Sequence, residues 1–408
     1  MIAARSEVRR IAVAAFLRAV ATGSIGVLLA AWLVELSFDP AEIGVVASAG
    51  LAGTALVTLT ATLLGDRLGR RRFQVGVALA GTAGGVALSM AATPALAAAA
   101  ALFGLVNAMG RDRGAGLLLD QTMLATLVAD GERTSLIARY NIVQDAGHAL
   151  GALSAALPTF AAERLGLDPV GALRLALLVY AAAMLATAAI YRGLGPAIES
   201  RVPMAARHRL SPSSRRILTR ICALFAVDSL AGGFLTATLL AYFFFERFRA
   251  SPAIVALLFF GARVANALSH AGAAWLARRI GLVNTMVFTH IPSSLLLATV
   301  PFAPSFAVAA ALFLLREGLV EMDVPTRQSY VLAVVRPEER TFASGATLLV
   351  RTASWAVAPA IAGSLMSATS LAMPLYLCAA LKIAYDIALW LSLRKIRPPK
   401  EQGRGRTG

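Results

Sequence analysis

The stretch Gly65-Asp66-Arg67-Leu68-Gly69-Arg70-Arg71-Arg72 places a tight group of charges between two long apolar runs. Residues 41–64 before it and 73–91 after it are almost free of charge, apart from Glu42. Such a charged loop between two long apolar runs is not expected in a soluble domain. Between two membrane-spanning helices, the same group is typical of a short cytoplasmic loop, because positive charge keeps a loop inside.

The composition of the whole chain also indicates a membrane protein. Hydrophobic residues make up 58% of the 408 residues, charged residues make up 15%, and the mean hydropathy is +0.72. Soluble domains contain about 25% charged residues. A net charge of +16 can indicate a protein that binds nucleic acid. Here, however, the basic residues lie at the ends of apolar segments. We therefore expect a lipid bilayer around the chain and no nucleic acid as a partner.

Twelve segments are long and apolar enough to form transmembrane helices, which need about 20 residues each. The fold class predicted is an all-α polytopic membrane protein with twelve transmembrane helices in two pseudo-symmetric six-helix halves. The segments lie at 11–35, 41–64, 73–91, 96–128, 135–158, 171–191, 217–244, 252–275, 283–302, 305–334, 342–367 and 371–393.

The positions of the basic residues predict the orientation. Most of the 38 Lys and Arg residues lie at the two ends and in the loops after every second segment, whereas the opposite loops hold only Arg164, Arg247 and Arg249. Loops rich in Lys and Arg stay in the cytoplasm. Both termini are therefore expected on the cytoplasmic side of the plasma (inner) membrane.

The longest polar stretch divides the chain into two halves that resemble each other. Glu132-Arg133-Thr134 after the fourth segment recurs after the tenth as Glu339-Arg340-Thr341. Such matches in the same order favour an internal duplication. We therefore predict an N-terminal six-helix half at 1–192, a basic cytoplasmic linker at 193–216, and a C-terminal six-helix half with a basic tail at 217–408.

The loop at 65–72 resembles the signature loop between the second and third helices of the major facilitator superfamily, G-x-x-x-D-R-x-G-R-R. Thr62 replaces the first glycine of that pattern. The stretches 281–287 and 322–330 are similar to bacterial members grouped with multidrug efflux carriers. The resemblance implies that the loop acts as a gating latch at the cytoplasmic ends of its two helices. The residues that carry the match are Asp66, Arg67, Gly69, Arg70 and Arg71.

Ionisable residues are unusually numerous inside the predicted spans, and each is costly in a bilayer unless it is paired or lines a cavity. By the resemblance, helices one, four, seven and ten line the central cavity. Three glycines near the middle of the fourth segment predict that this helix kinks or loosens there: Gly110, Gly114 and Gly116. The residues expected to bind substrate lie on the fourth and tenth segments: Asp112, Arg113, Arg316 and Glu317.

Two acids are candidates for proton coupling, Asp228 and Asp120. The apolar neighbours of Asp228 favour its protonated form, whereas a nearby cation such as Arg18 or Arg351 opposes it. A second interpretation is that the charges in the spans form ion pairs that only fix the packing. The residues assigned to such pairs are Arg18, Arg351, Asp323 and Arg327, together with Lys382 and Asp386 at i, i+4 spacing.

The sequence contains no recognisable motif for metal binding, redox chemistry, nucleotide binding or hydrolysis. The histidines and the two cysteines have no metal-ligand or redox spacing, and the chain contains no G-x-x-x-x-G-K-[ST] phosphate loop and no dinucleotide fingerprint. No Ser/His/Asp set stands out. We therefore expect no enzyme activity, no metal and no cofactor.

The function predicted is secondary active transport of a small solute by alternating access of the two halves, coupled to a proton or another ion gradient, in a monomer. Efflux of a drug or metabolite is one form of it. Because buried arginines are numerous, proton-coupled transport of a small organic or inorganic anion is the alternative. A remote alternative is a membrane enzyme or receptor, which would need a catalytic site or a large extramembrane domain.

Overall fold

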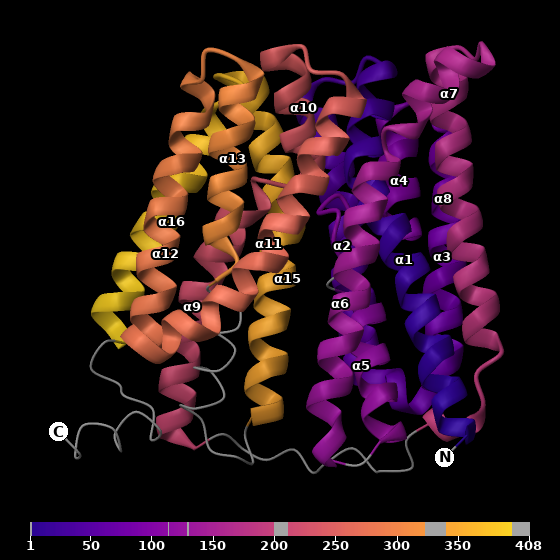
Figure 1. The fold of residues 1–408 in the computed structure, drawn as a ribbon, viewed down its shortest axis with the longest axis vertical. Helices are drawn as coiled ribbons and strands as arrows, with labels where there is room; N and C mark the ends of the chain where they lie inside the picture. Colours follow the sequence, from indigo (N-terminus) through magenta and orange to yellow (C-terminus); the bar gives the residue numbers. More distant parts are fainter. Residues whose placement is uncertain (1, 113, 129, 200–210, 323–339, 394–408) are drawn as a thin grey trace. The chain divides into compact units, whose positions relative to one another are not determined.

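The computed structural model describes residues 2–112, 114–128, 130–199, 211–322 and 340–393 (Figure 1). Within these residues all regular structure is helical, which confirms the predicted all-α class. The elements are α1 (Ile2–Glu35), α2 (Pro40–Leu68), α3 (Arg70–Met90), α4 (Pro94–Gly104), α5 (Ala115–Leu127), α6 (Asp130–Ser154), α7 (Leu157–Leu165), α8 (Pro169–Arg192), η1 (Pro196–Ile198), α9 (Pro212–Gly233), α10 (Ala237–Phe248), α11 (Pro252–Ile280), α12 (Leu282–Thr299), η2 (Val300–Phe302), α13 (Phe306–Val320), α15 (Arg340–Ala368) and α16 (Met373–Leu393).

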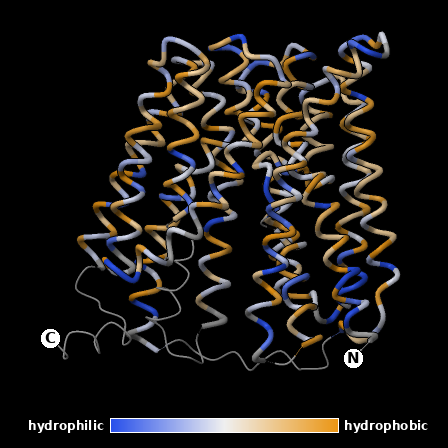
Figure 2. Tube along the Cα trace, viewed as in Figure 1, coloured by the Kyte–Doolittle hydropathy of each residue, from blue (hydrophilic) through white to orange (hydrophobic). Residues whose placement is uncertain are grey.

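The long helices have the length and hydropathy of membrane spans. Among the described residues, nine helices are long and apolar enough to cross a bilayer, and α4 and α5 are shorter apolar helices. Figure 2 shows hydrophobic residues along the length of these helices, interrupted by a few hydrophilic positions. Large apolar side chains are exposed, among them Phe103 (75%), Phe302 (74%) and Leu268 (70%). A surface with so many exposed apolar side chains is suited to contact with lipid. The chain is therefore an integral membrane protein.

The helices follow the predicted segments closely, with breaks at two of them. The fourth segment consists of α4 and α5, and the seventh consists of α9 and α10. The tenth segment begins as α13, and its later part lies outside the described residues. The short helix α7, between the fifth and sixth segments, has no counterpart in the sequence prediction.

Short polar residues followed by proline set several helix starts. Asp39, Asp168 and Ser211 each precede the proline that begins α2, α8 and α9, and each side chain accepts a hydrogen bond from the backbone N–H three residues further on. Proline fits the first position because the N–H that it lacks has no partner there. At α2 the Glu42 carboxylate also accepts from Asp39 N at 2.9 Å, which completes a capping box.

Two glycines form one-residue joints between long helices. Gly69 joins α2 to α3, Gly281 joins α11 to α12, and both have a φ of 86°. Glycine adopts this conformation without the steric cost that a Cβ brings. The next helix then begins on the glycine carbonyl, with Phe73 N at 3.0 Å from Gly69 O and Thr285 N at 3.1 Å from Gly281 O. The repeated joint is what an internal duplication would leave.

The helices group into two compact units. Unit 1 consists of Met1–Met204, Leu235–Phe260 and Trp355–Leu371. It therefore includes α10 and the last part of α15 besides helices from the first half of the sequence. The predicted limits of the two halves and of the linker stay a prediction. Unit 2 consists of Ala205–Phe234, Gly261–Ser354 and Ala372–Gly408.

Hydrogen bonds within unit 1 attach the pieces from later in the sequence. The Thr238 hydroxyl of α10 donates to Gly26 O of α1 at 3.0 Å. The Ala360 N–H of α15 donates to Ser48 Oγ of α2 at 2.8 Å. Side chains this small let the helices approach closely, so α10 and the end of α15 are integral parts of unit 1.

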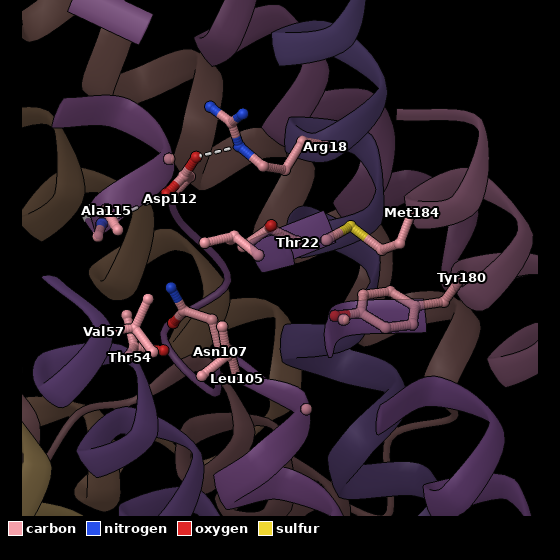
Figure 3. A pocket seen from close by; sticks show the side chains of 15 residues that line it. Arg18, Thr22, Thr54, Val57, Leu105, Asn107, Asp112, Ala115, Tyr180 and Met184 are labelled. Atoms are coloured by element: carbon pink, nitrogen blue, oxygen red, sulfur yellow. Dashed lines mark hydrogen bonds and ion pairs between the residues drawn. The ribbon is translucent and has the colours of Figure 1, made fainter. Parts of the chain in front are cut away.

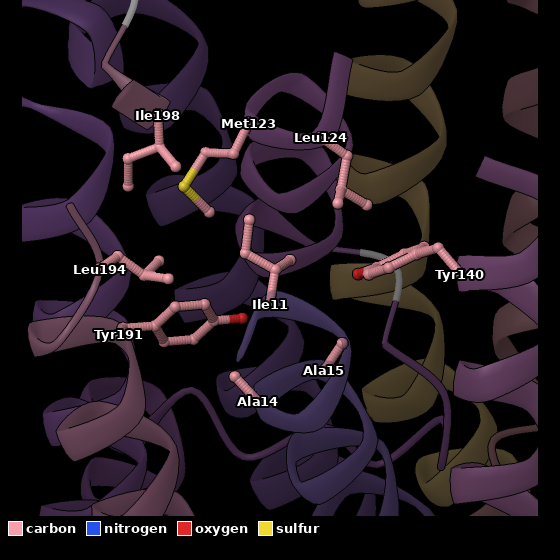
Figure 4. Close-up of a cluster of buried hydrophobic side chains, with 9 residues drawn as sticks. All are labelled: Ile11, Ala14, Ala15, Met123, Leu124, Tyr140, Tyr191, Leu194 and Ile198. Carbon is pink, nitrogen blue, oxygen red and sulfur yellow. The ribbon is translucent and has the colours of Figure 1, made fainter. Parts of the chain in front are cut away.

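A cluster of buried side chains packs around the N-terminal part of α1 in unit 1 (Figure 4). Tyr140 and Tyr191 place their rings in this cluster while their hydroxyls bind the Asp120 carboxylate. The packing of the two rings among apolar side chains thereby holds the hydroxyls of Tyr140 and Tyr191 next to the Asp120 carboxylate. Its members are Ile11, Ala14, Ala15, Met123, Leu124, Tyr140, Tyr191, Leu194 and Ile198.

Candidate functional site

The fourth predicted span is broken near its middle. α4 ends at Gly104 and α5 begins at Ala115, and the described residues between them are not helical. Leu105 (φ 55°) and Gly110 (φ 65°) turn the chain there. The predicted loosening of this helix is confirmed.

Side chains bind the polar backbone of the broken segment. The Asn107 amide donates to Arg111 O at 2.6 Å, and its oxygen accepts from Met109 N at 2.9 Å. Asp112 N donates to His148 Nε2 of α6 at 2.9 Å. Irregular backbone at membrane depth is tolerated only beside protein or water, and these contacts show how protein supplies the partners.

Arg18 of α1 is the centre of a buried charge network in unit 1. Its Nε donates to Asp112 Oδ2 at 2.5 Å, and its Nη2 donates to Asp120 Oδ2 at 2.7 Å. Its Nη1 contacts the Tyr191 hydroxyl. Arg18 is 4% exposed and Asp120 is 0% exposed. Because an unpaired charge at such depth is very costly, the arginine and the two acids depend on one another.

Asp120 accepts hydrogen bonds from four side chains. Besides Arg18, the Tyr140 hydroxyl donates at 2.8 Å, the Tyr191 hydroxyl at 2.8 Å and Gln74 Nε2 at 2.7 Å. Every one of these groups is a donor here, so both carboxylate oxygens are used as acceptors. The geometry suits an ion-pair role for Asp120, and its role in proton coupling stays a prediction.

The neutral partners of this network were not predicted from the sequence. They are Gln74, Tyr140, Tyr191 and His148, which form no motif there. A buried tyrosine hydroxyl usually finds a hydrogen-bond partner, which is the signal that could have found them. The partner itself depends on how the helices face one another, and one sequence does not contain that information.

A cavity of about 50 Å³ lies beside the break, inside unit 1 (Figure 3). Since about 10–15 Å³ is enough for one water molecule, the cavity has room for a small polar group. Figure 3 shows Thr22 and Tyr180 among the side chains that line it, with the Tyr180 hydroxyl on the side that faces the other labelled residues. The polar side chains that line it are Arg18, Thr22, Thr54, Asn107, Asp112 and Tyr180, and the apolar ones include Val57, Leu105 and Met184.

Unit 2 contains a second buried set of ionisable side chains, on α9, α12 and α16. Lys382 Nζ lies 2.8 Å from Asp228 Oδ1 and 3.3 Å from His290 Nε2. His290 Nδ1 lies 3.0 Å from the Asp386 carboxylate. None of the four is more than 6% exposed. The four groups therefore form a continuous polar chain from Asp228 to Asp386.

Lys382 and Asp386 of α16 have partners on other helices besides the spacing of a local pair. Lys382 contacts the Asp228 carboxylate of α9 and His290 of α12, and His290 also contacts Asp386. Local spacing shows only that two residues share a helix face, so it did not indicate these partners. The local pair itself stays a prediction.

A cation lies beside Asp228, as expected, and one such cation is Lys382, at 2.8 Å. Arg18 contacts the carboxylates of Asp112 and Asp120. Arg351 of α15 donates from Nε to Ser229 Oγ at 3.2 Å, next to Asp228 along the chain. The sequence did not indicate Lys382, because it lies more than 150 residues from Asp228.

Arg316 and Glu317 of α13 contact each other through Nη1 and Oε1. The second oxygen of Glu317 accepts from Asn266 Nδ2 of α11 at 2.8 Å. Both charged residues are buried, at 7% and 6% exposure. Among the described residues, Arg316 Nε, Asn266 Oδ1 and Ser269 Oγ find no hydrogen-bond partner. The pair thus neutralises itself but leaves polar atoms around it unsatisfied.

The signature loop is attached to the chain that follows α8. The Arg70 and Arg71 N–H groups donate to the two Glu199 carboxylate oxygens at 2.7 and 3.2 Å. Arg71 Nη1 also donates to Leu194 O at 2.8 Å. A carboxylate is favourable at a helix N-terminus because the backbone N–H groups there are unpaired. Sequence reasoning did not identify Glu199, whereas Arg67 of the loop is exposed.

The structure brings some of the predicted site residues together and leaves others unplaced. Those it brings into contact are Arg18 with Asp112 and Asp120 in unit 1, and Arg316 with Glu317 in unit 2. Those that lie outside the described residues are Arg113, Asp323, Arg327 and, for its side chain, Asp66.

Comparisons with known proteins agree with this architecture. No protein-family model matches the chain. An uncharacterized membrane protein of Saccharomyces cerevisiae is 24% identical over 419 residues, which cover 95% of this chain and 94% of the yeast protein.

Solved transporter structures share the fold at low sequence identity. The nucleoside transporter NupG aligns with a TM-score of 0.75 at 15% identity over 96% of this chain and 100% of NupG. The xylose transporter XylE from E. coli aligns with a TM-score of 0.69 at 13% identity over 97% and 99%. A bacterial homolog of the human lysosomal transporter Spinster aligns with 0.70 at 14% identity over 94% of each chain. The protein therefore has the all-helical membrane fold of these transporters.

Proposed function

We propose that this protein is a secondary active transporter of the major facilitator superfamily that moves a small solute by alternating access. The observation that carries the proposal is the break at 105–114 beside a polar cavity in unit 1. Secondary transporters commonly build their binding sites from discontinuous helices, whose free backbone groups face the solute. The similar structures, which are a nucleoside transporter and a xylose transporter, support a small solute as the cargo.

The substrate-binding residues of the proposal are Asp112, Arg113, Arg316 and Glu317. Asp112 supports it, because this acid lies in the broken segment and lines the cavity. The Arg316–Glu317 contact supports a site in which the carboxylate neutralises the arginine until solute competes for it. Arg113→Gln is expected to abolish transport while leaving the protein inserted and folded, and loss of expression instead would favour a packing role.

Proton coupling is proposed at Asp228, through the polar chain of unit 2. Lys382 can donate to His290 Nε2 only while that nitrogen carries no proton. A proton taken up by His290 would therefore remove the Lys382–His290 contact and change the packing between α12 and α16. This link between a proton and helix packing is what coupling requires.

The signature loop is proposed as the cytoplasmic latch, in a monomer with both termini in the cytoplasm. The hydrogen bonds of Glu199 to Arg70 N and Arg71 N support it, since they hold the start of α3 in place. Asp66→Asn is expected to increase the cysteine accessibility of the cytoplasmic side, measured with a membrane-impermeant thiol reagent. Unchanged accessibility would contradict the latch.

The anion alternative receives less support from the contacts. Arg18, Arg316 and Lys382 each already bind a carboxylate, at Asp112 and Asp120, at Glu317 and at Asp228. An arriving anion would have to displace one of these carboxylates. Drug or metabolite efflux and solute uptake both remain compatible with the contacts.

Transport by the purified full chain in proteoliposomes tests the proposal. Uptake of radiolabelled uridine, D-xylose, benzoate and tetraphenylphosphonium is measured with and without an imposed pH gradient. Saturable uptake of at least one solute, accelerated by the gradient, is expected. Asp228→Asn is expected to keep exchange and lose the acceleration. Uptake equal to that of empty liposomes for every solute would contradict the transporter assignment.

A further inference from the structure

Two hydroxyl groups that line the cavity of unit 1 make no hydrogen bond among the described residues. They belong to Thr22 of α1 and Tyr180 of α8, which are 8% and 5% exposed (Figure 3). Neither oxygen is among the fully enclosed side-chain atoms that lack a partner, so both can be reached from the cavity. The cavity therefore offers two hydroxyls to a group that enters it.

The described charges beside the cavity leave one negative charge in excess, because the Arg18 guanidinium faces two carboxylates. The Nε, Nη1 and Nη2 atoms of Arg18 contact Asp112, Tyr191 and Asp120. The two oxygens of Asp112 accept from Arg18 Nε and from Gly114 N. Among the described residues, an anionic ligand would therefore meet an excess of negative charge, which disfavours it.

The remaining polar groups suit a ligand that both donates and accepts. Thr22 and Tyr180 offer hydroxyls, and the amide of Asn107 offers a donor and an acceptor beside them. A hydroxyl group matches all three, because it has one donor and two acceptor positions. An apolar drug would leave the hydroxyls of Thr22 and Tyr180 unsatisfied, which a polar site penalises strongly.

We infer that this cavity binds the hydroxyl-bearing part of a polar solute that carries no negative charge, and that Thr22 and Tyr180 determine the specificity for it. The inference rests on the proposed function, because it names the substrate class of that carrier. The volume of about 50 Å³ limits the enclosed part to a few non-hydrogen atoms. A sugar, a nucleoside or a small polyol has such a part.

The test is ligand protection of a reporter cysteine, which does not depend on transport. Met184 lines the cavity on α8, so Met184→Cys is made in the full chain with Cys222→Ser and Cys378→Ala. The labelling rate of the purified protein with a small methanethiosulfonate reagent is measured alone and with glycerol, D-xylose, uridine, benzoate or tetraphenylphosphonium. At least one of the three hydroxylated probes is expected to slow labelling about fivefold or more, and benzoate and tetraphenylphosphonium are expected to have no effect.

Variants that remove one hydroxyl each then test the two specificity residues. Tyr180→Phe and Thr22→Val are expected to reduce the protection to less than twofold. Thr187→Val on the same helix as Tyr180 is the matched control, because the Thr187 hydroxyl is buried and bound to Ala183 O of its own helix. This control is expected to keep the protection.

The outcomes separate the inference from the proposed function. Protection by benzoate or tetraphenylphosphonium alone, or by no probe, overturns the inference, and in the last case the cavity holds water only. Equal protection in Tyr180→Phe, Thr22→Val and the control overturns the assignment of these two residues. Protection by a hydroxylated probe in a protein that transports none of the solutes supports the inference and contradicts the transporter assignment.

Discussion

Gly69 and Gly281 adopt the same conformation at the same kind of joint, each as a single residue with a φ of 86° between two long helices. A side chain is strained in this part of conformational space, at a cost of about 1–3 kcal/mol. We therefore expect Gly281→Ala to lower the free energy of unfolding by that amount, measured as a lower thermal midpoint in detergent.

Gly345→Ala on α15 is the control for this prediction. A Cβ added at Gly345 meets nothing within 4 Å, and the residue lies inside a helix. Alanine is favoured over glycine there by about 0.5–1 kcal/mol. Equal effects at Gly281 and Gly345 would mean that the positive φ is not what the glycine supplies.

Asp120→Asn is expected to destabilise unit 1 strongly. The substitution leaves Arg18 without one of its two carboxylates, and breaking a buried pair in this way costs about 3–5 kcal/mol. Asp145→Asn is the control, because Asp145 lies exposed on α6. Thermal midpoints of the two variants are compared. A loss at Asp120 as small as that at Asp145 would contradict the network as a source of stability.

The Asp228–Lys382 pair gives a double-mutant test. Asp228→Asn and Lys382→Met are each expected to destabilise the protein, since each leaves a buried charge with fewer partners. The double variant is expected to be more stable than the sum of the single losses implies, by about 1 kcal/mol or more. Additive losses would show that the two groups do not act on each other.

The same variants test coupling. If Asp228 carries the proton, Asp228→Asn loses gradient-driven uptake in proteoliposomes but keeps solute exchange. If the pair only fixes the packing, the variant loses exchange together with stability. Wild-type uptake that is indifferent to an imposed pH gradient would remove Asp228 from the coupling mechanism.

Glu199→Gln is expected to weaken the attachment of the chain after α8 to the start of α3. It replaces a carboxylate that accepts from two backbone N–H groups, and charge-assisted bonds at a helix N-terminus contribute about 0.5–2 kcal/mol. The thermal midpoint is expected to fall by a corresponding amount and to fall less at high salt. Glu163→Gln, at an exposed position of α7, is the control and is expected to change little.

Most of the fold could be predicted from the sequence because the spans depend on local properties. Length, hydropathy and the charges between segments identify a helix without reference to its neighbours. The break in the fourth span was also predictable, since Gly110 and Gly114 flank charged residues in an apolar run. The break after Gly233 in the seventh span was not predicted, although the pair Gly232-Gly233 stands there, because no charged residue lies beside it.

The partners in the site could be predicted only in part. Charged residues in spans could be identified one by one, and Arg18 does pair with carboxylates. Which acid it meets depends on helix rotation and register. The local rule for Lys382 and Asp386 did not indicate His290, which contacts both from another helix, for the same reason.

The network around Arg18 has a consequence for how the chain is made. Arg18 enters the membrane with the first helix, but Asp112 and Asp120 follow 94 and 102 residues later. During synthesis the arginine is therefore in the membrane before its counter-charges exist. A lone arginine at a helix centre resists insertion by about 2.5–3.5 kcal/mol. The first helix should then remain beside the translocation machinery until α5 emerges. Assembly of unit 1 in the membrane would therefore be completed only after its fourth span has been synthesised.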